Sequence, residues 1–172
     1  MNKNKAPDQF NKLIQSLEQE IELFSEMSET IQKKQKAIIS GEVEELREYV
    51  ASEKEYIEKS MDLAKQRKNI QMEISSKFNL DYSKPKLKTI IEIAPPDQSI
   101  KLSNLRYRLE EILNAITRIN NENKLLLNFS IEHVKGMARL FLNIDEEDHE
   151  VYGITGIKRA KQTNNKMLDF QI

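Results

Sequence analysis

The 172-residue sequence contains no cysteine and no tryptophan, and only four glycines and four prolines. Without cysteine the chain cannot form disulfides, a catalytic thiolate or a cysteine-based zinc site. A chain this poor in glycine and proline has few turns, which favours a small number of long helices. No apolar run approaches the roughly 18 residues of a membrane span. We therefore expect an all-α, soluble protein that is not inserted in a membrane.

Charge is balanced, with 27 basic and 28 acidic residues and a net charge of -1. Lysine and glutamate are interleaved, as on solvated helix faces, and no global field draws the chain to nucleic acid. The first ten residues, MNKNKAPDQF, are basic, but no apolar stretch follows them, so they do not read as a secretory signal. These features favour a cytoplasmic protein.

The N-terminal part predicts a helical hairpin. Asp8 is expected to cap a helix over residues 8–39, and Ser40 with Gly41 makes a tight break before a second helix over residues 42–78. The apolar residues of the first helix recur with a period near 3.5 residues. They are Phe10, Leu13, Ile14, Leu17, Ile21, Phe24, Met27, Ile31 and Ile38.

The second helix carries two neighbouring apolar stripes, which predict two helical neighbours. The predicted main seam is formed by Val43, Leu46, Val50, Ile57, Ala64, Ile74 and Phe78. The flanking stripe is spaced by sevens and consists of Tyr49, Tyr56, Leu63 and Ile70. After Phe78 the pattern ends at Pro85 and the Pro95–Pro96 pair, which leaves room for one short connector helix over residues 86–93.

The last predicted helix covers residues 99–144 and begins in a regular heptad register. Six positions are all leucine or isoleucine: Leu102, Leu109 and Ile116 at a, and Leu105, Ile112 and Ile119 at d. From Asn123 the same register becomes partly polar, while apolar residues spread around the helix in the stretch NKLLLNFSIEHVKGMARLF. By length, this stretch is expected to extend beyond the hairpin.

These elements predict one elongated domain over residues 1–144, made of an antiparallel hairpin, a short connector helix and a long C-terminal helix, all coiled-coil-like. Residues 145–172 have no sustained periodicity, and we expect them to form a mobile tail.

Sites for catalysis or cofactors are not indicated. His133 and His149 are the only histidines and lack carboxylates at metal-binding spacing, and the acidic run at residues 145–148 lacks the pattern of a calcium loop. Gly153 and Gly156 do not complete a phosphate-binding loop. We therefore expect no enzyme activity, no metal and no cofactor.

The apolar C-terminal stretch is the strongest functional feature, and it has two interpretations. It is either core combined with dimerisation, as in a structural coiled-coil protein, or a surface that binds a partner helix. The residues alone do not decide between them.

Three segments of the chain carry a resemblance to a known family. The second helix has a central glutamate, Glu53, and a late arginine, Arg67. The stretch from Asn123 forms an apolar C-terminal helix, and VYGITG follows it with Tyr152 and Gly153. In this order the segments resemble the second helix, the C-terminal helix and the following Tyr-Gly segment of the FlgN family of flagellar type III export chaperones. The resemblance extends from about Phe10 to Gly156 and is loose over residues 79–98.

The resemblance implies a function in flagellar export without nucleotide hydrolysis. The clients would be the hook-filament junction proteins FlgK and FlgL, bound by their C-terminal amphipathic segments, and Tyr152 with Gly153 would help docking on the export gate protein FlhA. A weak homodimer is compatible with this interpretation. The expected client-binding residues are Asn123, Leu126, Leu127, Phe129, Ser130, Val134, Met137, Leu140 and Phe141.

Overall fold

The computed structural model describes residues 6–80 and 86–142, and within these ranges the chain is all-α. Four helices are present there: α1 (Ala6–Ser40), α2 (Val43–Lys77), α3 (Leu87–Ile93) and α4 (Pro96–Leu142). Helix α1 begins two residues before Asp8, which lies in the first turn and is not the cap. Helix α4 begins at Pro96, where proline suits a first helical position because its missing N–H would have no partner there.

The chain divides into two compact units, Met1–Ser130 and Ile131–Ile172, and α4 contributes to both. The first unit contains the hairpin, α3 and most of α4. The predicted boundaries at residue 144 and the expected mobility of residues 145–172 stay predictions, because that segment lies outside the described residues. None of the helices in residues 6–80 and 86–142 has the length and hydropathy needed to cross a membrane.

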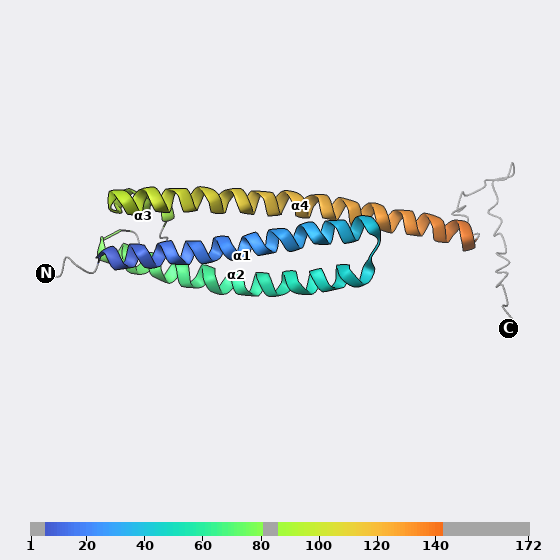
Figure 1. Cartoon of the computed structure of the whole chain (residues 1–172), viewed down its shortest axis with the longest axis horizontal. Helices are drawn as coiled ribbons and strands as arrows, with labels where there is room; N and C mark the ends of the chain where they lie inside the picture. The colour runs from blue at the N-terminus through green and yellow to red at the C-terminus, as the bar shows by residue number, and fades with distance from the viewer. Residues whose placement is uncertain (1–5, 81–85, 143–172) are drawn as a thin grey trace, which may run out of the picture. The chain divides into compact units, whose positions relative to one another are not determined.

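Helices α1 and α2 form the predicted antiparallel hairpin, and the first part of α4 runs parallel to α1 (Figure 1). The hairpin turn is built on Gly41, whose φ of 75° is the left-handed conformation that glycine adopts freely. The N–H of Glu42 donates to the carbonyl of Ala37 at 3.0 Å, which is the six-to-one bond of a Schellman motif. Helix α1 therefore ends at Ser40 for a local backbone reason.

Helix α2 ends by the same device. Asn79 has a φ of 53°, and the N–H of Leu80 donates to the carbonyl of Ser75 at 2.9 Å. Asparagine tolerates this conformation better than most residues. The residue before Asn79, Phe78, packs its ring against the Phe10 ring of α1, with 5.7 Å between the ring centroids. This contact closes this end of the hairpin.

The core follows the predicted seams of α1 and α4. All the predicted seam residues of α1 are buried except Phe24, which is partly buried against the core. In α4, four of the six positions of the heptad register are buried: Leu102, Leu109, Ile116 and Ile119. The other two, Leu105 and Ile112, are partly buried and pack against them. The connector helix contributes the fully buried Ile90 to the same core. The predicted registers of α1 and of the first part of α4 are confirmed.

The predicted main seam of α2 is wrong for three of its first four residues, whereas the other one, Leu46, is half-buried. Val43, Val50 and Ile57 are exposed, whereas the predicted flanking stripe from Tyr49 to Ile70 is half-buried. Ile74, near the end of the predicted main seam, is fully buried. The hairpin therefore packs through a face of α2 that is rotated away from the row of valines and isoleucine.

Candidate functional site

Asn123 marks the point at which the regular register of α4 becomes polar. Its side chain is only 1% exposed, and its Nδ2 donates to the backbone carbonyl of Ile31 in α1 at 3.2 Å. Beside it, the Lys34 Nζ of α1 donates to the Asn120 Oδ1 at 3.3 Å. Asn123 was expected in the client-binding surface, but a partner cannot reach it while α4 is packed on α1. It is a contact between α1 and α4.

The next turns of α4 change from burial to exposure. Leu126, Leu127 and Ser130 are half-buried, and the Ser130 hydroxyl donates back to the carbonyl of Leu126 at 3.0 Å. Phe129 is 76% exposed and Leu125 is also exposed. Apolar side chains therefore lie on the outside of α4 within the first unit.

The part of α4 that belongs to the second unit carries many exposed apolar side chains. Six large hydrophobic side chains are exposed there: Ile131, Val134, Met137, Leu140, Phe141 and Leu142. Large side chains gathered in this way are typical of an interaction surface, because single soluble domains seldom expose so much contiguous apolar area.

The charges in this part of α4 are mainly basic. Glu132 is paired with Lys135 at 2.8 Å, and that hydrogen bond is the main reason why the pKa of Glu132 is lowered, with Arg139 contributing. Within residues 6–80 and 86–142, no three histidine or acidic side chains are grouped so that they could hold a metal ion.

Comparison with protein families identifies the family to which this chain belongs. The model of one family, described as FlgN protein, matches residues 1–169. The chain belongs to the FlgN family. Comparisons with curated proteins and with solved structures gave no match. The FlgN family consists of flagellar export chaperones that bind export substrates, and it is not known as a family of enzymes.

Two charged residues of the FlgN-like second helix have structural roles. Arg67 of α2 donates through Nε to the Glu20 Oε1 of α1 at 2.7 Å, and Glu53 of α2 pairs with Lys34 of α1. Burial raises the pKa of Glu20, and Arg67 opposes this effect. Both pairs join the two helices of the hairpin, so these residues fix the hairpin and are not free to contact a client.

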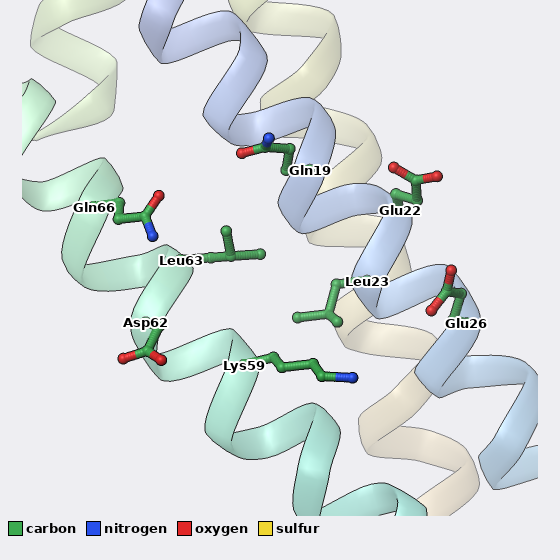
Figure 2. Close-up of a pocket in the computed structure, with 8 residues that line it drawn as sticks. All are labelled: Gln19, Glu22, Leu23, Glu26, Lys59, Asp62, Leu63 and Gln66. Atoms are coloured by element: carbon green, nitrogen blue, oxygen red, sulfur yellow. The ribbon is translucent and has the colours of Figure 1, made fainter.

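A groove of about 480 Å³ lies between α1 and α2. Figure 2 shows that Leu23 and Leu63 in this groove face one another. Its other lining residues are polar or charged: Gln19, Glu22, Glu26, Lys59, Asp62 and Gln66. With two leucines and a mostly charged rim, this groove offers less apolar contact than the exposed part of α4 does.

Some exposed residues of α4 are absent from the predicted site, and two predicted site residues lie outside the described residues. Leu125, Ile131 and Leu142 of α4 are exposed but were not among the expected client-binding residues. Their positions off the heptad register were the available signal. Tyr152 and Gly153 lie outside the described residues. The exposed row on α2 was also missed, because its spacing is that of a core seam.

Proposed function

We propose that this FlgN-family chaperone binds the C-terminal amphipathic segments of hook-filament junction proteins of the FlgK and FlgL type. Binding would take place in the cytoplasm, would prevent premature assembly of these clients and would end with delivery to the export gate protein FlhA. Client and gate would be bound by different parts of the chain, α4 for the client and the segment around Tyr152 and Gly153 for the gate.

The observation that carries this proposal is the exposed apolar surface of α4. Residues 127, 134 and 141 are seven apart, as are residues 130 and 137, so these five share one face of a helix. They are Leu127, Ser130, Val134, Met137 and Phe141. This face is the one that an amphipathic client helix would cover by helix-to-helix packing.

The remaining proposed client-binding residues broaden that face. Leu126, Phe129 and Leu140 are the other members. A specific complex typically buries about 800 Å² on each partner. Full burial of a large apolar side chain contributes about 1.5 to 3 kcal/mol, so several of these residues would be needed together to offset the cost of association. Ser130 would favour one register over others, as polar residues do in coiled-coil seams.

Co-purification with a hook-filament junction protein tests the proposal. We expect the full-length client to form a defined complex with this chain, and a client that lacks its C-terminal amphipathic segment to form none. A client with a deletion of similar size elsewhere serves as the control and should still bind. Equal binding of the two truncated clients would contradict the proposal.

Gate docking is separable from client binding in this proposal. Tyr152→Ala is expected to leave the affinity for the client near wild type, because the proposed client-binding residues end at Phe141, and to weaken binding of the loaded chaperone to the cytoplasmic part of FlhA. Both affinities are measured with the same preparation by calorimetry. An equal loss of both would argue against two separate binding regions.

A further inference from the structure

Methionine supplies all the sulfur in this chain, which has six methionines and no cysteine. Cysteine thiolates are usually the side chains that react first with peroxides. Where they are absent, the thioether of methionine is the sulfur that a peroxide oxidises. The positions of the methionines therefore determine what such an oxidant does to this protein.

The methionines among the described residues differ in exposure and in location. Met27 of α1 belongs to the core and is 8% exposed. Met61 and Met72 of α2 are 67% and 40% exposed, and Met137 of α4 is 43% exposed. A small oxidant can therefore reach the last three, and of these four methionines Met137 is the one that belongs to the proposed client-binding face.

Met137 lies among apolar residues of that face. Val134 precedes it by three residues, and Leu140 and Phe141 follow it by three and four. Residues three or four apart are neighbours on the surface of a helix, and all three of these neighbours are exposed. A client helix that covers Val134 and Phe141 must therefore also cover the side chain between them.

We propose that Met137 makes the client-binding face sensitive to oxidation, so that conversion of its thioether to the sulfoxide by a peroxide releases the client. This inference rests on the proposed function of α4. In the reaction a sulfur lone pair attacks one peroxide oxygen, the S–O bond forms and the O–O bond breaks. The second oxygen leaves as hydroxide and is protonated to water, so the sulfur is oxidised by two electrons and the peroxide is reduced.

The sulfoxide changes the polarity of the face without changing its charge. Its oxygen accepts hydrogen bonds from water while Met137 is exposed, so the free chain tolerates the modification. An apolar client helix would remove this water and offer no donor in exchange, and a buried polar group without a partner is unfavourable. The affinity for the client should fall by about 10-fold or more.

The modification is also reversible in principle. Methionine sulfoxide reductases return the sulfoxide to the thioether, with a dithiol as the reductant: the oxygen leaves as water and the thiols form a disulfide. The chain has no cysteine to act as that reductant. Restoration of client binding therefore depends on an external dithiol system, and Met137 reports the balance between peroxide and that system.

Controlled oxidation of the full chain tests the proposal. The chain is treated with hydrogen peroxide until peptide mass spectrometry shows one added oxygen at Met137. The affinity for a labelled C-terminal segment of a hook-filament junction protein is then measured by fluorescence anisotropy. We expect the affinity to fall by about 10-fold and to recover after treatment with a methionine sulfoxide reductase and a dithiol. Circular dichroism should show unchanged helix content.

Substitutions assign the effect to one sulfur atom. Met137→Leu keeps an apolar side chain of similar volume, so it should bind the segment like wild type and keep its affinity after peroxide. The matched control, Met61→Leu, removes an exposed methionine of α2 and should still lose affinity. Met137→Gln introduces a polar side chain without any oxidant and should weaken binding, whereas Met61→Gln should not.

Several outcomes would overturn the proposal. These are oxidation of Met61 and Met72 while Met137 stays unmodified, an unchanged affinity after oxidation of Met137, or an equal loss of affinity in Met137→Leu. In each of these cases the untreated chain still binds the segment, so the proposed function stands. If the untreated chain does not bind the segment, the proposed function is rejected and this inference is rejected with it.

Discussion

Replacing Val134 and Phe141 together by serine is expected to weaken binding of the client's C-terminal segment by about 100-fold. Both side chains belong to the proposed client-binding face of α4, and they are 65% and 79% exposed. If the client covers them fully, each contributes about 1.5 kcal/mol or more to the complex, and 1.4 kcal/mol corresponds to a factor of ten in affinity. The affinity is measured by fluorescence anisotropy with a labelled client segment.

Because the two side chains are exposed, the same substitutions should leave folding of the chain nearly unchanged. Thermal unfolding followed by circular dichroism is expected to give a midpoint close to that of wild type. This combination separates loss of a binding surface from loss of structure, which a substitution at the buried Leu109 would not do.

Leu125→Ser with Leu142→Ser is the matched control for this experiment. Both leucines are exposed residues of α4 and outside the proposed client-binding residues. Spacing places Leu125 on nearly the opposite side of the helix from Val134. An equal loss of affinity in the control would mean that any exposed apolar residue of α4 is sufficient, and no loss in either variant would remove α4 as the client-binding helix.

The sequence was sufficient to predict α1 and the first part of α4 because their apolar positions leave only one register. In α4, Leu102, Leu109 and Ile116 fill successive a positions, and a rotation of the helix would expose all of them. The ends of α1 and α2 were close to the expected residues because Gly41 and Asn79 supply the left-handed conformations that end them.

Helix α2 was not predictable in the same way because it carries two stripes with the same spacing. Periodicity alone cannot decide whether Val43, Val50 and Ile57 or the tyrosine stripe faces the hairpin. The available signal was electrostatic. Glu20 and Lys34 on α1 are separated by the same number of residues as Glu53 and Arg67 on α2. When the two helices run antiparallel, this equal spacing brings Glu20 to Arg67 and Lys34 to Glu53, so both pairs have opposite charges.

The candidate site was only partly predictable for a related reason. The sequence showed where apolar residues spread around α4, but not which of them the hairpin covers. Asn123 continues the core register and is buried, whereas Phe129, six residues later, is exposed. A polar residue in a seam is compatible with either outcome, and only the carbonyl of Ile31 opposite Asn123 decided it.

Arg67→Ala is expected to lower the free energy of unfolding by about 3 kcal/mol at pH 8, the usual cost of breaking a buried ion pair. The Glu20 side chain is 3% exposed and the Arg67 side chain 27% exposed. Removal of Arg67 leaves the Glu20 carboxylate buried without its cationic partner. Urea unfolding at fixed temperature measures the change.

The loss should depend on pH, and its sign follows from the pKa of Glu20. Burial holds this pKa above its ordinary value, and Arg67 counteracts the shift, so the variant raises the pKa further. A carboxyl group whose pKa is higher in the folded state adds stability below the pKa of the unfolded chain, about 4.3, and this contribution is lost as pH rises through the folded value. The deficit of the variant is therefore largest at pH 8 and shrinks as the pH falls towards 5.

Two further variants make the test specific to the buried pair. Glu20→Gln in the Arg67→Ala background removes the charge that lost its partner, so it should restore part of the stability and abolish the extra pH dependence. Arg47→Ala breaks the exposed pair with Glu44 on the same helix and should change stability little, because exposed pairs contribute little. A deficit that is the same at pH 8 and pH 5, or no larger than that of Arg47→Ala, would mean that Glu20 and Arg67 do not hold α1 and α2 together.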